Sequence, residues 1–399
     1  MLHAAAMHIY LDYNATTPVD RAVLEAMLPY FAENFGNASS IHSSGQRGRS
    51  AVDAARDSVA ALIGAKPAEV VFTSGGTEAD NLALFGSVMA SNQSRKHVIT
   101  TAIEHHAVLN AAQALEKQGI DVTYVSVGSD GVVDPQDIRR ELRTETTLIS
   151  VMHANNELGT IQPIEQIGRI AAEADVYFHC DAVQSAGKIP LDVNRLGVDL
   201  LSVSAHKIYG PKGIGALYVR TGTPLAPQSH GGHHERDLRP GTENVPGIVG
   251  FGKAAQLAKM NCETDAARVA RVAVLRDRLE EMLISSLGSV HVNGDRSRRV
   301  ANTTNLAFAG AGGEALVIAL DLQGISCATG AACSSGAVEP SHVLLAIGLS
   351  ADEARSSLRF SLGRATTSDE IDRAIAIIPP TVERLRALSP RTLAAVHAR

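Results

Sequence analysis

The sequence predicts an α/β fold in which a mostly parallel sheet flanked by helices forms a large unit, and a smaller α+β unit follows. Two observations carry this prediction. Short β-rich runs alternate with helical patterns between Val70 and Val203, which is typical of βαβ units and a parallel sheet. After about Gly250 the pattern changes to one long amphipathic helix and a separate group of strands.

The elements of the larger unit follow one another in a regular order. Apolar runs rich in Val, Ile, Phe and Tyr predict its strands. These strands lie at residues 70–73, 97–100, 122–125, 147–151, 176–180 and 199–203. Helical patterns begin at Thr77 and run from His106 to Lys117. The smaller unit has a helix over residues 265–287, and its strands lie near 289–292, 303–308 and 357–362.

The length of 399 residues favours two domains, because a single hydrophobic core usually stops growing at roughly 250–300 residues. We place the boundary just before the long helix. Residues 16–260 then form a large domain, and residues 261–399 form a small C-terminal domain. Residues 1–15 are expected to pack on the small domain.

Composition and charge exclude several classes of protein. The chain is 45% hydrophobic and has a net charge of -6 without a long basic block, so it is a poor candidate for binding nucleic acid or an anionic membrane. Its four cysteines form no CxxC pair, and neither a disulfide framework nor a metal site is predicted. No apolar run approaches the roughly 20 residues that cross a bilayer. We therefore expect a soluble protein in a cytoplasmic setting.

Polar residues follow a buried strand in the segment from Ser202 to Gly213. The carboxyl ends of strands are where open α/β sheets bind ligands. A partly desolvated lysine there can lose its proton and act as an amine nucleophile, as a Schiff base with an aldehyde cofactor requires. Lys207 is the candidate, although a surface lysine in a turn is the commoner explanation when the segment is taken alone.

Two neighbouring segments suit the same chemistry. Asp181 ends an apolar strand, where a carboxylate can keep a pyridinium nitrogen protonated, and Gln184 can donate to a ring hydroxyl. The alternative for Asp181 is a helix N-cap. The turn SGGT at residues 74–77 joins a strand to a helix, so its N–H groups can bind phosphate. It is neither a P-loop nor a Rossmann fingerprint, and a Gly-Gly turn is more often only a turn.

Three other segments carry side chains with possible roles in chemistry. His105 and Asn156 stand in polar segments that follow strands. The role of the histidine is left open between metal binding, acid–base chemistry, ring stacking and a purely structural one. Arg359 lies on an alternating strand and suits a substrate carboxylate, although a structural ion pair is its usual role. Residues 327–336, CATGAACSSG, form a Gly-rich loop. Such a loop cannot bury a cysteine well, so its thiol is either reactive or incidental.

Together these motifs resemble those of the cysteine desulfurases of the NifS/IscS type, which are pyridoxal phosphate enzymes of fold type I, similar to the class V aminotransferases. The resemblance runs from YLDYNATTP at residues 10–18 to LRALSP at residues 385–390. Between these ends stand, in order, FTSGGTEADN, EHHAVL, HANNELG, HCDAVQS, SAHKIYGPKGIGALY, RPGTEN, GAACSSG, EPSHVL and SLRFSLGR. It implies that the large domain binds pyridoxal 5′-phosphate and that the small domain carries the catalytic cysteine.

The resemblance implies a role for each candidate around the cofactor. Lys207 would form the Schiff base, Asp181 would pair with the pyridine nitrogen, and His105 would stack on the ring. Gln184 and Asn156 would lie around the ring hydroxyl. The phosphate would be held by Gly76, Thr77, Ser204, His206 and, from the opposite subunit of a homodimer, Thr242.

The resemblance also implies the reaction. Arg359, with Asn156, would bind the carboxylate of L-cysteine, and Cys333 would take its sulfur as a persulfide, leaving L-alanine. His105 is a candidate acid–base partner of the substrate thiol. The sulfur would pass to an acceptor protein such as an iron–sulfur scaffold. The rivals are a selenocysteine lyase or a class V transaminase, which share Lys207, and a cofactor-free scaffold that has kept the fold.

Overall fold

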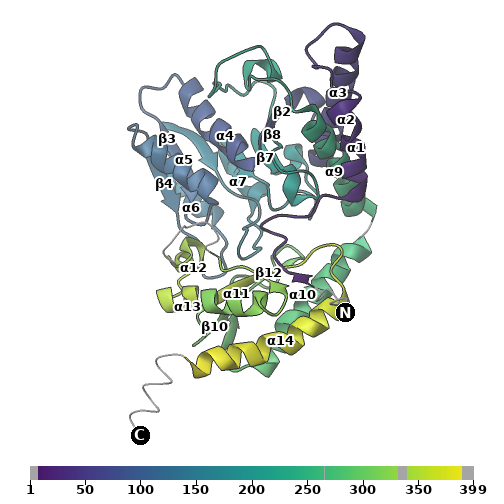
Figure 1. The fold of residues 1–399 in the computed structure, drawn as a ribbon. Helices are drawn as coiled ribbons and strands as arrows, with labels where there is room; N and C mark the ends of the chain where they lie inside the picture. Colours follow the sequence, from purple (N-terminus) through teal and green to yellow (C-terminus); the bar gives the residue numbers. More distant parts are fainter. Residues whose placement is uncertain (1–7, 265, 331–338, 389–399) are drawn as a thin grey trace.

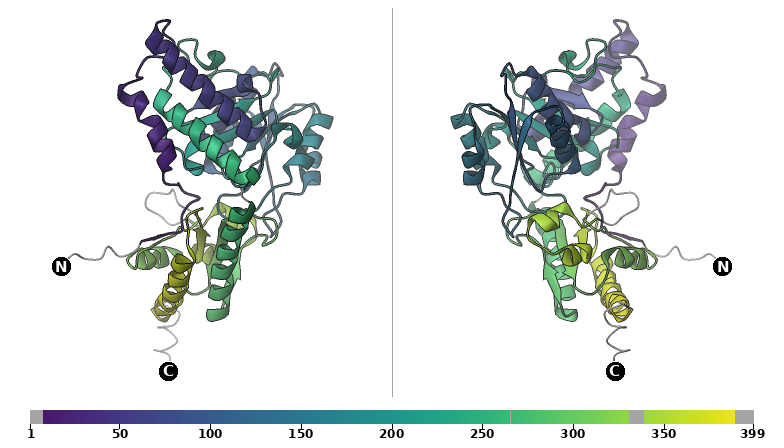
Figure 2. Two further views of the ribbon diagram at one scale, coloured as in Figure 1. Left: turned by 90° about the vertical axis from the view of Figure 1, so that its right-hand side faces the viewer. Right: turned by 90° about the vertical axis from the view of Figure 1, so that its left-hand side faces the viewer.

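The structure is a computed structural model that describes residues 8–264, 266–330 and 339–388. A larger body built round a seven-stranded sheet lies above a smaller one in Figure 1. The two bodies are connected by α9 (Val245–Thr264), which leads into α10 (Ala266–Ser286). The side views in Figure 2 show that the N-terminal segment also crosses between the bodies.

The central sheet has the strand order β2-β8-β7-β6-β5-β3-β4. Its strands are β2 (Val70–Thr73), β3 (His97–Thr101), β4 (Asp121–Val125), β5 (Thr146–Ser150), β6 (Tyr177–Asp181), β7 (Leu200–Ser204) and β8 (Gly215–Val219). All neighbours are parallel except β8, which is antiparallel to β2 and β7. The six predicted strands and the mostly parallel sheet are confirmed. β8 is absent from the prediction, because it follows a Gly- and Pro-rich turn that is typical of a loop.

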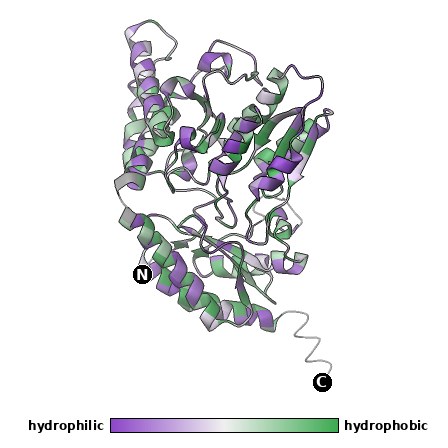
Figure 3. Ribbon diagram, turned by 180° about the vertical axis from the view of Figure 1, so that it is seen from behind, coloured by the Kyte–Doolittle hydropathy of each residue, from purple (hydrophilic) through white to green (hydrophobic). Residues whose placement is uncertain are grey.

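Helices cover both faces of this sheet, and successive residues of each strand point to opposite faces. Val71, Val98 and Leu148 belong to a core shared with α4 and α5, whereas their successors in sequence pack with α3, α7 and α9. The helices of the larger body are α1 (Arg21–Met27), α2 (Pro29–Ala32), α3 (Ser43–Ile63), α4 (Gly76–Ala90), α5 (His106–Glu116), α6 (Pro135–Glu141), α7 (Ile164–Glu173), α8 (Val193–Leu196) and α9. In Figure 3 hydrophobic residues dominate the strands, while the helices alternate between hydrophobic and hydrophilic residues. The result is a three-layer α/β body with a double core.

The smaller body has its own antiparallel sheet of order β12-β10-β9 and its own core. Apolar side chains of α10, α11 and α14 fill that core against the sheet. The elements that follow α10 are β9 (Val290–Val292), β10 (Thr303–Phe308), α11 (Gly313–Asp321), β11 (Ile325–Ser326), α12 (His342–Ala346), α13 (Ala351–Arg355), β12 (Ser357–Ser361) and α14 (Ser368–Ala387). The predicted long helix and three strands of this unit are confirmed.

The N-terminal segment contacts both bodies in turn. β1 (Ile9–Tyr10) pairs in parallel with β11, and Ile9 and Leu11 enter the core of the smaller body. A few residues later, the N–H of Thr17 donates to the carbonyl oxygen of His206 at 3.0 Å, in the larger body. Residues 12–16 therefore lie where the two bodies meet. No helix in the described parts of the chain combines the length and the apolar composition needed to cross a membrane.

Candidate active site

A cavity of about 230 Å³ opens at the carboxyl ends of the parallel strands β6 and β7. Its lining residues come from strand ends, from the first turn of α4 and from the start of α5. They are Gly76, Thr77, Asp80, His105, Met152, Asn156, Asp181, Val183, Gln184, Ser204, His206 and Lys207. Nine of the twelve are predicted site residues, so side chains spread over 132 positions of the sequence (from 76 to 207) meet at one place.

One wall of the cavity is the turn that begins α4. Gly76 and Thr77 are the first residues of this 15-residue helix, so their N–H groups have no partners within it and lie at the positive end of the helix dipole. A Cβ at Gly76 would lie 2.8 Å from Cγ2 of Val183, so a larger residue in this turn would require the neighbouring segment to shift. Opposite this turn, Ser204 is buried. The arrangement suits a bound anion such as a phosphate.

His105 is the N-cap of α5, and its Nδ1 accepts a hydrogen bond of 3.1 Å from the N–H of Ala107. Burial, and then the positive charge of Lys207, lower the pKa of His105 to about 4. The ring is therefore neutral near pH 7. Because Nδ1 is the acceptor, the proton of the neutral ring lies on Nε2.

Buried carboxyl groups surround the end of β6. Asp181 accepts a hydrogen bond of 2.9 Å from the N–H of Val183, and burial raises its pKa to about 6. Asp80, which is 1% exposed, also lines the cavity, and burial, then Asp181, raise its pKa well above the usual value. Burial likewise raises the pKa of Glu104 to about 8. Near pH 7 Asp181 is the most readily ionised of the three, and a cationic group beside it would favour its charged form.

Asp80 was not among the predicted site residues. It lies three residues after Thr77 on α4, and residues three apart share a face of a helix. That spacing is the signal in the sequence that could have identified it.

Lys207 ends a short turn of helix, Ala205–Lys207, that directly follows β7. Its Nζ donates to the carbonyl oxygens of Asn14 and Ala15, at 2.5 and 2.8 Å. These carbonyls belong to the N-terminal segment, which contacts both bodies. The position of the Lys207 amine is therefore linked to the junction between them.

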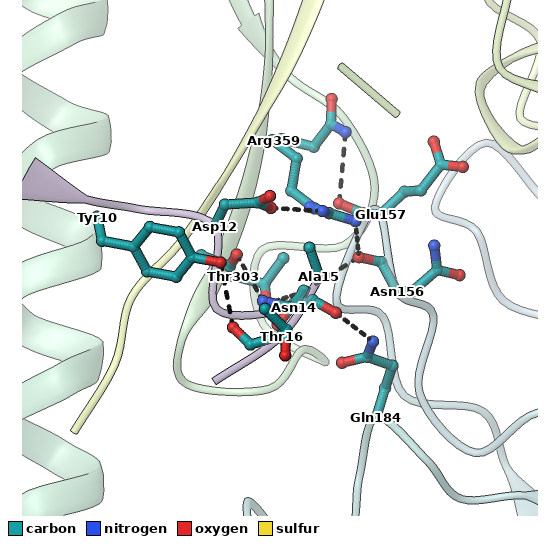
Figure 4. Close-up of polar contacts among 12 residues, drawn as sticks. Tyr10, Asp12, Asn14, Ala15, Thr16, Asn156, Glu157, Gln184, Thr303 and Arg359 are labelled. Carbon is teal, nitrogen blue, oxygen red and sulfur yellow. Dashed lines mark hydrogen bonds and ion pairs between the residues drawn. The ribbon is translucent and has the colours of Figure 1, made fainter. Parts of the chain in front are cut away.

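Asn14, which is 1% exposed, forms hydrogen bonds to both bodies at this junction. It was not among the residues predicted from the sequence. Its Nδ2 donates to the carbonyl oxygen of Asn156 at 3.1 Å and to Oγ1 of Thr303 at 2.9 Å. Figure 4 shows these contacts together with the hydrogen bond from Gln184 to the Asn14 carbonyl. The partners lie at least 142 positions away in the sequence, so no local pattern marks the residue.

Arg359, on β12, does not line the cavity but contacts a residue that does. Its Nη1 donates to the carbonyl oxygen of Asn156 at 3.0 Å, and its Nη2 forms a 2.6 Å ion pair with Asp12 (Figure 4). The guanidinium is buried, and within the described residues its Nε–H has no partner. The two terminal nitrogens of this guanidinium are thus held in place, while its Nε–H is available to bind a ligand.

Thr242 is exposed and lies outside the cavity of its own chain. Its segment is held by an ion pair of 2.9 Å between Arg239 and Glu78, which is in the first turn of α4. The segment is therefore tied to the turn that begins α4, although the Thr242 side chain does not reach that turn's cavity within one chain.

The cysteines differ from the prediction in one respect. Cys333 lies outside the described residues. Cys327, the first residue of the Gly-rich segment, is 7% exposed and belongs to the core of the smaller body, and burial raises its pKa to about 12. The expectation that this segment buries no cysteine is therefore wrong at Cys327, because the chain there still pairs with β12 at Arg359.

Three buried polar atoms on residues that line the cavity have no hydrogen-bond partner within the described part of the chain. They are Oδ1 of Asp80, Oδ1 of Asn156 and Oγ of Ser204. Buried polar groups are nearly always paired. The residues present therefore fit a polar ligand that carries an anionic group at the α4 turn and a basic nitrogen at Asp181.

Comparisons with known proteins agree with this geometry. The family described as "Aminotransferase class-V" matches residues 9–374. The chain is 53% identical to "Cysteine desulfurase IscS" of Anaeromyxobacter sp. (strain Fw109-5) over 96% of this chain and 94% of that protein. It is 49% identical to "Cysteine desulfurase IscS" of Dictyoglomus turgidum over 96% of both.

Solved structures give the same result. A "NIFS-LIKE PROTEIN" superposes with a TM-score of 0.89 at 37% identity, covering 95% of this chain and all of that one. "SspA in complex with cysteine" superposes with a TM-score of 0.79 at 39% identity, covering 90% and 100%. The fold is therefore the fold-type I arrangement that the sequence predicted, and the chain belongs to the class V aminotransferase family, among its cysteine desulfurases of the NifS/IscS type.

Proposed function

We propose that this chain removes sulfur from L-cysteine with the help of pyridoxal 5′-phosphate, giving L-alanine and a persulfide on Cys333. One observation carries the proposal: Lys207, Asp181, His105 and the turn at Gly76 line a single cavity. An amine, a carboxylate, a flat neutral ring and an anion site are what the aldehyde, pyridine nitrogen, ring face and phosphate of that cofactor need. The names of the relatives support the same reaction.

The residues that would hold the cofactor are those that line the cavity. We assign the phosphate to Gly76, Thr77, Ser204 and His206, and the ring hydroxyl to Gln184 and Asn156. The unpartnered oxygens of Ser204 and Asn156 support this assignment. Asp181, whose carboxyl group is buried beside other acids, would keep the ring nitrogen protonated.

When bound, pyridoxal phosphate supplies an electron sink for the α-carbon of the substrate. The chain supplies the rest. The Lys207 amine takes the Cα proton, and Arg359 binds the substrate carboxylate through the Nε–H donor that its contacts with Asp12 and Asn156 leave available. His105, whose proton lies on Nε2, exchanges a proton with the substrate sulfur.

The sulfur leaves through Cys333. Its thiolate attacks the substrate sulfur, so that an S–S bond forms while the Cβ–S bond breaks and its electron pair stays with the substrate carbon. Protonation of that carbon completes alanine. Enzyme thiol and cysteine thus give enzyme persulfide and alanine without an outside oxidant or reductant. The outer sulfur then passes to an acceptor, for which we propose an iron–sulfur scaffold protein.

A homodimer would complete the site. Large apolar side chains are exposed in and after α1 and α2, where a soluble chain gains by covering them. They are Leu24, Leu28, Phe31, Phe35 and Ile41. Thr242 is exposed and does not line the cavity of its own chain, which supports a contact with the phosphate of the opposite subunit. We also assign the cofactor domain to residues 16–260 and the small domain to residues 261–399, with residues 1–15 packing on the latter.

The proposal is tested with purified protein supplied with pyridoxal 5′-phosphate. We expect borohydride to fix the cofactor on Lys207, identified by mass spectrometry of the peptide. In a second sample that has not been treated with borohydride, added L-cysteine should give alanine and, before any reducing thiol is added, a persulfide on Cys333. Protein that fixes no cofactor would refute the cofactor assignment, and alanine formed without a persulfide would refute the sulfur route.

Replacing Arg359 with alanine is expected to raise the KM for L-cysteine about 10- to 100-fold, because a charge-assisted hydrogen bond to the carboxylate contributes about 1.5–3 kcal/mol. Steady-state kinetics measures this. Arg355→Ala is the matched control, since Arg355 is an exposed arginine that also pairs with an aspartate, Asp352. A loss of kcat at unchanged KM would contradict the assigned role.

A further inference from the structure

Lys188 lies close to the candidate active site and has no part in the reaction described above. It follows Gln184 by four residues in the turn after β6, and Gly187, just before it, has a φ of 69°. A Cβ at Gly187 would lie 2.8 Å from Cγ2 of Ile208, so the left-handed conformation and the close approach both require glycine. This turn brings the Lys188 amine back onto Gln184.

The Lys188 amine makes two hydrogen bonds to side-chain oxygens. It donates to Oε1 of Gln184 at 2.8 Å and to Oδ1 of Asn14 at 2.9 Å. On its other edge, Gln184 donates from Nε2 to the carbonyl oxygen of Asn14 at 3.0 Å, as Figure 4 shows. The amide of Gln184 is therefore held between a donor and an acceptor.

These two partners decide which way the amide faces. The oxygen and nitrogen of a glutamine amide have nearly the same shape, and only their partners distinguish them. A flipped Gln184 would place its NH2 against the N–H groups of Lys188 and its oxygen against the carbonyl of Asn14. Burial, then Lys207 and Arg359, lower the pKa of Lys188 well below its usual value. An uncharged amine keeps two N–H donors, so the orientation holds in either state.

We propose that Lys188 is a positioning residue that fixes the Gln184 amide, so that its nitrogen rather than its oxygen is offered to the ring hydroxyl of the cofactor. This proposal rests on the proposed function, since it assumes that pyridoxal phosphate binds in the cavity that Gln184 lines. Nε2 has two N–H groups, and Asn14 occupies one. The second can donate to an ionised ring oxygen, whereas an amide oxygen in its place would repel it.

The test replaces Lys188 with methionine, which is also unbranched, is one atom shorter, and has no hydrogen-bond donors. We expect the dissociation constant of pyridoxal 5′-phosphate to rise about tenfold and the visible absorption band of the bound cofactor to shift from that of the wild type. Lys96→Met is the matched control, because Lys96 also donates to an oxygen of the protein, the Val88 carbonyl at 2.6 Å, away from the cavity. It should leave affinity and spectrum unchanged.

A second substitution separates positioning from general loss of stability. In a Gln184→Ala background, Lys188→Met should weaken cofactor binding no further, because Lys188 acts through Gln184. An undiminished penalty in that background, or a wild-type spectrum and affinity in K188M, would overturn the proposal. Lys188→Leu should give the same results, so the test does not depend on one variant folding. A wild-type protein that binds no cofactor would refute the proposed function instead.

Discussion

Replacing Lys207 with alanine is expected to lower alanine formation from L-cysteine by about 10⁴-fold, the upper end of what removing a positioned acid–base group costs. The effect is large because we assign this one amine two tasks, the covalent bond to the cofactor and removal of the Cα proton. The variant should still bind pyridoxal 5′-phosphate, since the anion-binding turn and Asp181 remain, but borohydride should no longer fix it to the protein. Activity assays and mass spectrometry measure the two effects.

The control for this prediction is Lys212→Ala, which removes an exposed lysine five residues further along the same segment. It should retain wild-type activity and a reducible cofactor. The thermal unfolding temperature of K207A should also be measured, because the substitution removes the hydrogen bonds from Lys207 to the carbonyls of Asn14 and Ala15 and so can lower stability. If K207A is folded and still forms alanine at a tenth of the wild-type rate or more, Lys207 is not the nucleophile.

Much of the cavity could be predicted because neighbouring parallel strands have their carboxyl ends at the same edge of the sheet. Asp181 and Ser204 each end a strand, β6 and β7, and Lys207 follows three residues after Ser204. Since β6 and β7 are parallel neighbours, polar residues just after them must lie on the same edge of the sheet. The periodicity that predicted the strands thereby predicted the meeting of these side chains.

The contacts of the N-terminal segment could not be predicted in the same way. Asp12 pairs with Arg359, 347 positions away, and Asn14 contacts Lys207, 193 positions away. These pairs depend on how the two bodies fit together, and neither residue lies in a periodic pattern. The burial of Cys327 has a similar origin, because its own segment is small and Gly-rich while its neighbours come from the core of the smaller body.

Replacing Cys333 with serine is expected to abolish alanine release from L-cysteine while the cofactor stays bound to Lys207 with its wild-type absorption. A serine hydroxyl is not ionised near neutral pH and cannot accept sulfur as a persulfide, whereas a thiolate can. We expect a loss of at least about 10³-fold, of the order of removing a catalytic nucleophile or base. Alanine production at the wild-type rate by C333S would refute the persulfide route, as a lyase that needs no thiol would predict.

The interpretation of this result depends on whether another cysteine could accept the sulfur in place of Cys333. Burial raises the pKa of Cys180 far above its usual value and that of Cys327 to about 12, so at pH 7 the thiolate fraction of Cys327 is about one in 10⁵. Neither can replace Cys333. Cys262 is only half-buried and lines a second cavity that also reaches Lys207, which makes Cys262→Ser the matched control. It should keep full activity and a persulfide, because Cys262 does not line the cavity whose residues are assigned to the cofactor. If C262S instead lost the persulfide while C333S kept it, the sulfur acceptor would be Cys262.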